Sequence, residues 1–411
     1  MNQVWKKKSQ EEIKKIVFGA LTETVDYRKH HALGVPASYL DKQVFNQDVS
    51  FLQEAPYLSA LLQNPNHIGC HTLGKSESFF KGTHQIEREL IEICAVDILK
   101  GERAAQDGYV SSGGTEANIQ AVWTYRNYYQ DLFAAKSEEI CVLCSEDSHY
   151  SMSKAANLLG LSIYKVKVEQ DSRKISGHNI SAAIRAAKAE GKKYFVVVCN
   201  MITTMFGSVD DIDLYTQQLE AQSCLYKLHV DGAYGGFYYP FCNPESRLTF
   251  ENPHISSFTL DAHKMAQAPY GTGVFIIRKN LIHHVHTKEA SYVEGEDCTL
   301  IGSRSGANAI AVWMILTKNG PHGWHEKVSI LQQRTNWLCQ KLKRMDMDFY
   351  RHPSSNIVAI KSTSINPSTA HRFGLVADNH ANPKWFKIVV MEHVTIDKLE
   401  ALIEAVVQPT L

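Results

Sequence analysis

Short apolar runs alternate with amphipathic segments through the middle of the chain. Strands are predicted over residues 139–144, 163–168, 193–201, 228–231, 255–260 and 274–278, with helices over 151–159 and 180–188 between them. The run 193–201 is apolar on both faces, which is typical of a strand buried within a parallel sheet. Because strand and helix repeat in this order, we expect an α/β fold with a mainly parallel sheet covered by helices on both faces.

The pattern changes towards both ends of the chain. The first 65 residues mix short helical patterns with turns and show no strong period, whereas apolar positions from 86 to 98 recur at helical spacing. After Gly306, helices are predicted over 307–318, 324–345 and 396–407, with a strand over 384–391. We therefore expect an N-terminal segment (1–65), a large α/β domain (66–305) and a small C-terminal α+β domain (306–411).

Composition narrows the class of protein. The 411 residues include 43 Lys and Arg and 43 Asp and Glu, so the formal net charge is zero, which argues against a nucleic-acid binder. No apolar run of membrane-spanning length occurs, and the charged start MNQVWKKKSQEEIKK does not resemble a secretory signal. An odd number of cysteines, nine, fits reduced thiols, so we expect a cytoplasmic protein that binds no membrane.

Two groups of residues resemble metal ligands. Cys141 and Cys144 form a C-x-x-C pair, but no second pair accompanies it, and a buried strand explains both as small core residues. His283, His284 and His286 have no matching carboxylate or cysteine nearby in the sequence and are expected on a solvated face. We therefore predict no metal site.

A glycine-rich turn is the first feature that indicates chemistry. In the segment GYVSSGGTEAN a short strand ends, and a helix begins around Gly113, Gly114 and Thr115. Two glycines let the backbone approach a ligand closely, and the free N–H groups of a helix N-terminus attract an anion such as phosphate. An ordinary capped turn is the alternative interpretation.

Two further polar residues lie at predicted strand ends. His149 follows one strand and precedes a helix, and Asp231 ends another strand just before small residues in HVDGAYGG. Ligands of open α/β sheets bind at the carboxyl ends of strands, and a carboxylate there needs a cationic or hydrogen-bonding partner. Each residue could instead cap a helix or turn.

A lysine in an apolar setting completes the set. Lys264, in the segment DAHKMAQAP, follows a strand and stands among alanines and a methionine. Burial disfavours the charged form of an amine and makes it a better nucleophile, as Schiff-base chemistry requires. The alternative is a surface lysine whose stem lies on apolar neighbours.

Together these features match one cofactor, pyridoxal 5'-phosphate (PLP). PLP needs a lysine for its aldehyde, a carboxylate for its pyridine nitrogen, a group that stacks on its ring and an anion site for its phosphate. Lys264, Asp231, His149 and the turn at Gly113–Thr115 supply these four requirements in turn.

The same motifs resemble a known family. SSGGTEAN, SHYSMSKAA, HVDGAYGG and DAHKM are similar in order and spacing to the group II PLP-dependent amino-acid decarboxylases, from about residue 67 to the end. The resemblance implies the aspartate-aminotransferase-like fold (fold type I), with a sheet of the seven-stranded type. A loop with Tyr292, the sequence Gly302-Ser303-Arg304 and the ending KIVVMEHVTIDKLEALI resemble the histidine and serine decarboxylase branch.

The resemblance also implies roles for individual residues. Lys264 would form the internal aldimine, Asp231 would pair with the pyridine nitrogen, and Ala233 and His149 would lie on opposite faces of the ring. Cofactor contacts are further implied for Gly113, Gly114, Thr115, Thr203, Thr204, His263 and, from a neighbouring subunit, Ser303. Ile202 departs from the family, which has a glycine before the two threonines.

Tyr292 is implied as a proton donor, alongside His149 and Lys264, and His71, Thr72 and Arg304 are implied on the substrate side. The predicted function is removal of the α-carboxylate of an L-amino acid as CO2, through an aldimine at Lys264 and a quinonoid intermediate, in a homodimer with shared active sites. Histidine, serine, aspartate, tyrosine and tryptophan remain open as substrates. Alternatives are a carbon–carbon lyase of the sphingosine-phosphate-lyase type, a transaminase or desulfurase, and a catalytically silent PLP-binding protein.

Overall fold

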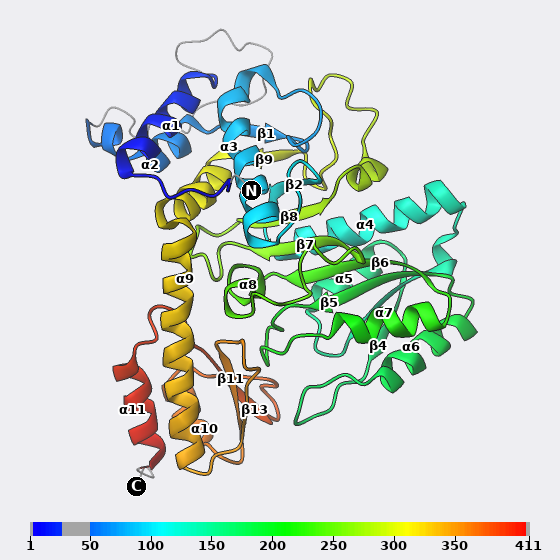
Figure 1. Ribbon diagram of the computed structural model, residues 1–411, viewed down its shortest axis with the longest axis vertical. Coiled ribbons are helices and arrows are strands. Elements are labelled where there is room, and N and C mark those ends of the chain that lie inside the picture. The colour runs from blue at the N-terminus through cyan, green and yellow to red at the C-terminus, as the bar shows by residue number, and fades with distance from the viewer. Residues whose placement is uncertain (1–2, 27–49, 408–411) are drawn as a thin grey trace.

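The computed structural model of the protein describes residues 3–26 and 50–407, and a seven-stranded sheet forms its centre (Figure 1). The strand order is β2-β8-β7-β6-β5-β3-β4, and β8 runs antiparallel to both of its neighbours, whereas β3 to β7 pair in parallel. The strands are β2 Gln106–Ser111, β3 Ile140–Ser145, β4 Ser162–Val166, β5 Tyr194–Asn200, β6 Leu225–Gly232, β7 Ile255–Asp261 and β8 Gly273–Arg278. The predicted mainly parallel sheet is confirmed.

Both faces of this sheet are buried, as the apolar runs predicted. Successive residues of a strand point to opposite faces. In β3, Cys141 and Leu143 accordingly join one apolar cluster, while Val142 and Cys144 join another. The two cysteines of the C-x-x-C pair therefore lie on opposite sides of the sheet, each fully buried, as small core residues.

Helices cover each face. On one side lie α4 Gly114–Phe133, α5 Ser151–Leu158 and the short η6 Leu281–Val285. On the other side lie α3 Lys81–Glu92, which continues as a π-helix over Ile93–Ile98, together with α6 Gly177–Ala189 and α7 Ile212–Ala221. Shorter pieces are η2 Ser78–Phe80, η4 Ser137–Glu139, η5 Gly235–Phe237 and α8 Tyr239–Cys242.

The N-terminal segment contains helices that the weak sequence period did not predict. α1 Gln10–Thr22 begins at a capping box formed by Ser9 and Glu12, and it buries Ile13 and Val17. η1 Ser50–Glu54 and α2 Pro56–Gln63 follow the undescribed residues 27–49. Next comes β1 Asn66–Ile68, which pairs antiparallel with β9 Ser303–Ser305, far along the chain.

A bent helix, α9 Gly306–Arg344, leads from β9 into the C-terminal part of the chain (Figure 1). The bend falls at Gly320, with φ of 66°, followed by Pro321, which explains why the sequence predicted two helices here. The start of the chain packs against this bend. The Trp5 indole N–H donates to the Leu316 carbonyl oxygen at 2.7 Å, and the Lys8 N–H donates to the Thr317 carbonyl oxygen at 2.9 Å.

The C-terminal part has its own antiparallel sheet, in the order β10-β11-β13-β12, and its own apolar cluster. Its elements are β10 Phe349–Tyr350, β11 Ile357–Lys361, α10 Pro367–Arg372, β12 Val376–Ala377, β13 Trp385–Val389 and α11 Ile396–Val407. The predicted α+β character, the strand and the final helix are confirmed. The domain limits at residues 65 and 305 stay a prediction.

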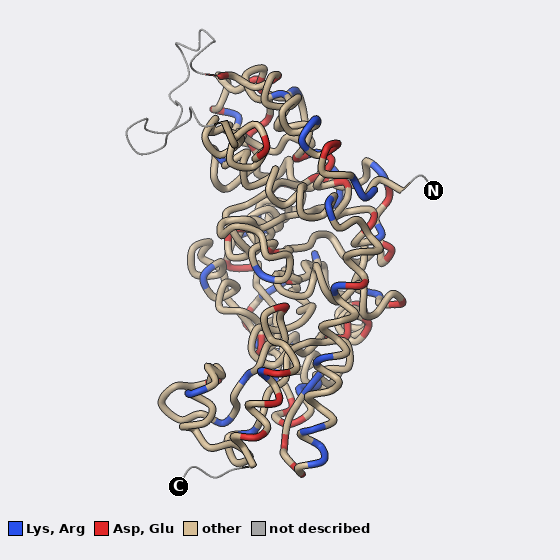
Figure 2. Tube along the Cα trace, turned by 90° about the vertical axis from the view of Figure 1, so that its left-hand side faces the viewer, with Lys and Arg blue, Asp and Glu red and all other residues tan. Residues whose placement is uncertain are grey.

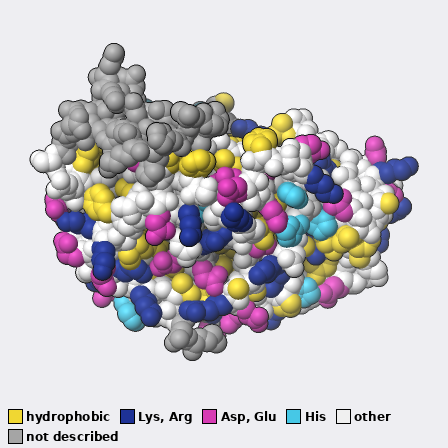
Figure 3. All heavy atoms as spheres, turned by 90° about the horizontal axis from the view of Figure 1, so that it is seen from above, with side chains coloured by type: hydrophobic (Ala, Val, Ile, Leu, Met, Phe, Trp, Pro, Cys, Tyr) yellow, Lys and Arg dark blue, Asp and Glu magenta, His cyan; other side chains and the backbone are white. Residues whose placement is uncertain are grey.

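Charged residues of both signs are interspersed along the described chain (Figure 2), and their side chains are mixed on the face seen from above (Figure 3). Within residues 3–26 and 50–407, no helix is long and apolar enough to cross a membrane.

The expectation that the histidines near residue 284 lack acidic partners was wrong. His283 Nδ1 lies 3.3 Å from Glu296 Oε2, and His284 Nδ1 lies 2.6 Å from Asp131 Oδ2. Cys298 also offers its thiol within 4.8 Å of His283 and Glu296. Sequence distance concealed these partners, because Asp131 comes from α4, and Glu296 and Cys298 from the segment before β9.

Candidate active site

A cavity of about 300 Å³ opens where β2, β6 and β7 end. Seven of the residues singled out from the sequence line it: Gly113, Gly114, Thr115, His149, Ala233, His263 and Lys264. Ser112, Glu116, Asn118, Tyr150 and Asp261 complete the lining. The fold thus brings together groups from four separate motifs, at the sheet edge where ligands of α/β proteins bind.

The glycine-rich turn connects β2 to α4. Gly113 has φ of 150°, a conformation that favours glycine. A Cβ on Gly114 would lie 3.0 Å from both the Ala233 Cβ and the Asp261 Oδ2, so no side chain fits there without displacement. The 20-residue helix α4 presents its N-terminus and Thr115 to the cavity, which suits an anion.

Lys264 reaches the cavity just beyond the end of β7. Its Nζ lies 3.4 Å from Asp261 Oδ2, and His263 Nδ1 lies 2.8 Å from Asp261 Oδ1. The wholly apolar setting expected for this amine was wrong, because its ammonium faces a buried carboxylate. Ala262, Met265 and Ala266 are buried in the core as expected, but they surround the backbone of the motif.

Asp231 lies at the end of β6, beside the cavity, and is 7% exposed. Its Oδ1 accepts a hydrogen bond from the Ala233 N–H at 3.1 Å, and its Oδ2 accepts one from Asn118 Nδ2 at 2.9 Å. Two donors therefore stabilise a nearly buried negative charge, which meets the requirement set for this residue.

Asn118 also connects Asp231 to the imidazole of His149. Its Nδ2 lies 2.9 Å from Ser151 Oγ, and Ser151 Oγ lies 2.9 Å from His149 Nδ1. Burial lowers the pKa of His149, against the opposing charge of Asp231, so the neutral ring prevails near pH 7. Because Ser151 Oγ accepts from Asn118, its own proton is free to bond His149 Nδ1.

The orientation of the Asn118 amide is fixed from behind by His229. Asn118 Oδ1 lies 3.0 Å from His229 Nε2, and His229 Nδ1 lies 2.7 Å from Ser257 Oγ. Burial lowers the pKa of His229 to about 4, so this ring is neutral and donates its Nε2 proton to Asn118.

Sequence reasoning missed Asn118 and His229, although a signal existed. Asn118 follows Gly114 by one helical turn and so shares its face of α4. His229 precedes Asp231 by two residues and so shares its face of β6.

The two threonines after β5 lie outside the cavity lining. Thr203 is buried, and its Oγ1 lies 2.7 Å from Ser208 Oγ, whereas the Thr204 side chain is exposed. Ile202, which replaces the family's glycine, keeps φ at 68° with its side chain 3% exposed. A β-branched residue is strained in this left-handed conformation, so the chain keeps the bend at a cost in backbone energy.

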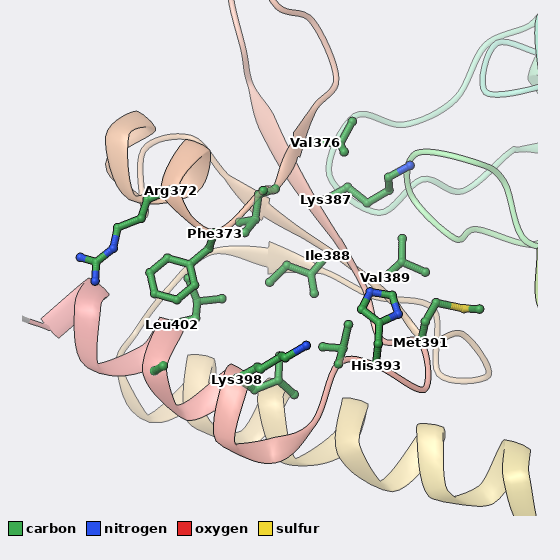
Figure 4. A pocket seen from close by; sticks show the side chains of 15 residues that line it. Arg372, Phe373, Val376, Lys387, Ile388, Val389, Met391, His393, Lys398 and Leu402 are labelled. Atoms are coloured by element: carbon green, nitrogen blue, oxygen red, sulfur yellow. The ribbon is translucent and has the colours of Figure 1, made fainter.

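Lys387, on β13, is a third residue that sequence reasoning missed. Its Nζ donates to the Thr204 carbonyl oxygen at 2.9 Å, and burial together with the positive charge of Lys264 lowers its pKa. In Figure 4 its amine points away from Phe373 and Leu402 and towards loops of the large domain. A cation of the C-terminal sheet thus faces the same region as Lys264.

Two of the remaining predicted site residues have side chains that are exposed to solvent. Tyr292 is 88% exposed, and Ser303 is exposed on β9, next to Asn66 of β1. Neither lines the cavity of its own chain.

The residues predicted on the substrate side, Arg304, His71 and Thr72, lie near β1 and β2 and outside the cavity. The Arg304 guanidinium is buried in an ion pair with Glu87 and donates to the Gly69 and Val110 carbonyl oxygens. Burial opposes ionisation of Glu87, but Arg304 and a bond from His67 hold the pKa of its carboxyl well below the usual range.

His71 and Thr72 also make contacts within this buried layer. The His71 ring stacks on His84 at 3.4 Å, and its side chain is 2% exposed. Thr72 Oγ1 accepts a hydrogen bond from the Gly108 N–H at 3.2 Å. Arg304, His71 and Thr72 are therefore all absent from the lining of the cavity.

The arrangement fits PLP on this chain's own geometry. A cradle that excludes a Cβ, a helix N-terminus, a buried carboxylate, an imidazole and an amine surround or border one cavity. The cradle and the helix N-terminus together form an anion site, so these features supply the four kinds of group that PLP requires.

The chain belongs to the pyridoxal-dependent decarboxylase family, whose conserved domain matches residues 86–360. It is therefore a PLP-dependent amino-acid decarboxylase, a carboxy-lyase, and the predicted cofactor, reaction and fold type are confirmed.

Two curated relatives place it more closely. It is 50% identical over 401 residues to a tryptophan decarboxylase of Clostridium sporogenes, covering 97% of this chain and 96% of that one. It is 30% identical to a probable L-tyrosine/L-aspartate decarboxylase of Methanocella arvoryzae, covering 85% and 92%.

Solved structures share the fold at lower identity. L-methionine decarboxylase of Streptomyces sp. 590 superimposes with a TM-score of 0.71 at 20% identity, over 84% of this chain and 86% of that one. A sphingosine-1-phosphate lyase of Burkholderia pseudomallei superimposes with a TM-score of 0.68 at 19% identity, over 80% and 77%. At such identities the likeness shows the fold alone.

Proposed function

We propose that the substrate is L-tryptophan and the product its amine. The 50% identity to a tryptophan decarboxylase over nearly the whole of both chains supports this choice over tyrosine or aspartate, which are named for a relative at 30% identity. The place in the histidine and serine decarboxylase branch rests on Tyr292 and the Gly-Ser-Arg sequence and stays a prediction.

We further propose how the cavity holds the cofactor. Lys264 would hold the aldehyde carbon, the Gly113–Thr115 turn and His263 the phosphate, and Asp231 the ring nitrogen, with Ala233 and His149 on the two ring faces. When bound, PLP supplies an electron sink for cleavage of the bond to the carboxylate. The observation that carries this proposal is the single cavity, which Lys264, His149 and the glycine turn all line and which Asp231 borders.

The protein's own groups then have distinct tasks. Asp231, which accepts hydrogen bonds from Asn118 and from the Ala233 N–H, would hold the proton of the ring nitrogen. Asp261, 3.4 Å from Lys264 Nζ, holds the ammonium of Lys264 in the cavity. His149, whose Nδ1 faces Ser151, keeps its Nε2 proton for the cavity side.

Return of a proton to the α-carbon needs a donor at the cavity. Lys264 and His149 line it, whereas Tyr292 is 88% exposed and would have to move with its loop. We therefore favour Lys264 or His149 over Tyr292 as the donor within one chain.

Lys387 is our candidate for holding the substrate carboxylate. The substrate carboxylate would need a cation to pair with. The pKa of Lys387 is lowered first by burial and then by the positive charge of Lys264, so the two amines repel each other. A carboxylate placed between the two amines would relieve their mutual repulsion and fix the orientation of the bond that breaks.

The test is CO2 release by the holoenzyme across the twenty amino acids, with product identification. We expect tryptophan to give the highest kcat/KM and stoichiometric amine and CO2, and Lys264→Ala to give none. An aldehyde product instead of CO2 would support the lyase alternative, and a faster reaction with another amino acid would replace tryptophan as the substrate.

We also propose a homodimer with shared active sites. Ser303 is exposed and outside its own chain's cavity, which supports the expectation that it reaches the neighbouring phosphate. Mixing Lys264→Ala chains with Ser303→Glu chains should restore about a quarter of the wild-type activity, because half of the dimers would hold one intact site. No recovery in verified mixed dimers would refute sharing.

A further inference from the structure

A second cavity, of about 560 Å³, lies inside the C-terminal part of the chain (Figure 4). It is bounded by the end of α10 and the turn after it, by β13 and by α11. The side chains of Phe373, Ile388 and Leu402 approach it from these three elements. The volume suits a small organic ligand, and most of the lining is apolar.

The cavity exists because the sheet edge is left open here. β12 has only two residues, Val376 and Ala377, and pairs with Lys387 and Phe386 of β13. The rest of β13, from Ile388 onward, has no strand on that side among the described residues. The Phe373 and Leu402 side chains border this gap but do not fill it.

The charged groups around the cavity are all basic. Arg372, Lys387, His393 and Lys398 are among the lining residues, whereas no Asp or Glu is. Over the described part of the chain, neither Arg372 nor Lys398 forms an ion pair with a carboxylate. The Arg372 guanidinium lies 5.4 Å from the Phe373 ring centroid instead. Unpaired cations beside an apolar surface attract an anion that carries an apolar group.

We propose that this cavity binds an arylalkanoate, an aromatic monocarboxylate that lacks an amino group. The aromatic ring would lie against Phe373, Ile388 and Leu402, and the carboxylate would pair with Lys398, whose amine extends from α11 towards β13. The ammonium of an amino acid or of its amine would be repelled by the same cations. The cavity therefore distinguishes a deaminated acid from the substrate and product of the reaction.

An occupant would influence the active site through β13. Lys387 lines the cavity with its stem, and its amine reaches Thr204 in the large domain. A carboxylate in the cavity would attract this amine away from Thr204, so the KM for the amino acid should rise. This effect rests on the proposed role of Lys387, whereas binding in the cavity does not.

The test is isothermal titration of the holoenzyme with 3-phenylpropanoate. We expect saturable binding with one site per chain, weakened at least about tenfold by the double variant Arg372→Glu/Lys398→Glu. Lys343→Glu, an exposed cation on α9 outside the cavity, is the matched control and should bind as the wild type does.

Val376→Trp, at the exposed rim, narrows the cavity without changing charge and should also weaken binding. It keeps the proposal testable if the double variant unfolds. If the folded double variant binds the acid with unchanged affinity, the acid binds elsewhere, for example in the active site, and the proposal is overturned. Absence of saturable binding to the wild type would do the same. Binding without a rise in KM would refute only the connection through Lys387.

Discussion

Replacement of Asn118 tests what its hydrogen bond to Asp231 contributes to the reaction. The Asn118 amide donates to Asp231 Oδ2 and to Ser151 Oγ, both at 2.9 Å, and nothing in the sequence motif alone assigns it this task. Asn118→Leu has a similar shape but removes both donors. Asp231 then retains the hydrogen bond from the Ala233 N–H while it stays 7% exposed.

The size of the effect follows from the charge on the acceptor. A hydrogen bond to a charged group contributes about 1.5–3 kcal/mol, and each 1.36 kcal/mol is a factor of ten. Because the ionised carboxylate is the form that holds the ring proton, we expect kcat/KM to fall about 10- to 100-fold. Substrate affinity depends on other groups, so most of the loss should fall on kcat.

The assay is CO2 release from tryptophan between pH 5 and pH 9, with thermal unfolding measured on the same samples. Asn127→Leu is the matched control, because Asn127 lies on the same helix but donates to the His284 carbonyl oxygen, away from the cavity. Asn118→Asp is a second probe, which places a carboxylate against Asp231. Its activity should recover as the pH falls, because a shared proton relieves the repulsion.

The role of Asn118 as a donor to Asp231 is refuted if Asn118→Leu keeps the kcat and the pH profile of Asn127→Leu. It also fails if Asn118→Asp shows no gain at low pH relative to the wild type, because the amide would then be a packing residue only.

Substitutions at Ile202, Glu87 and His229 also have calculable outcomes. At Ile202, with φ of 68°, glycine should be less destabilising than alanine by about 1–2 kcal/mol in chemical denaturation, because alanine keeps the left-handed strain and loses the same burial. Glu87→Gln should cost about 3–5 kcal/mol by leaving Arg304 buried and unpaired, whereas the partly exposed Glu89→Gln should cost less than about 1 kcal/mol. Burial lowers the pKa of His229 to about 4. Below pH 6.5 His229 therefore takes up a proton in the unfolded chain while it stays neutral in the folded one. The free energy of unfolding of the wild type should fall by about 3 kcal/mol towards pH 4. His229→Gln should lack that part of the fall, and equal slopes in the two proteins would contradict it.

The sequence predicted the sheet well because its strands are apolar on both faces. β5 is the clearest case, because six of its seven residues are buried. The pattern is weaker where a strand is short, so the two-residue β10 and β12 were not predicted. α1 was missed as well, although Ile13 and Val17 are spaced one turn apart.

The site was predictable where one residue type at a strand end carries the signal. Gly114, His149 and Lys264 are such residues, and they all line the cavity. Asp261 and Lys387 were missed because their importance depends on what faces them. Asp261 acts on its neighbours His263 and Lys264, and Lys387 comes from a sheet whose position against the large domain no local pattern reveals.

The contact between the chain's start and the bend of α9 has a consequence for synthesis on the ribosome. Trp5 is 1% exposed, and its indole bonds a carbonyl near Gly320, as does the neighbouring Lys8 backbone. Trp5 and Lys8 thus have their partners in a segment translated much later. Until α9 emerges, this aromatic side chain stays unprotected in the nascent polypeptide, so its contact with the helix can form only after α9 has been translated.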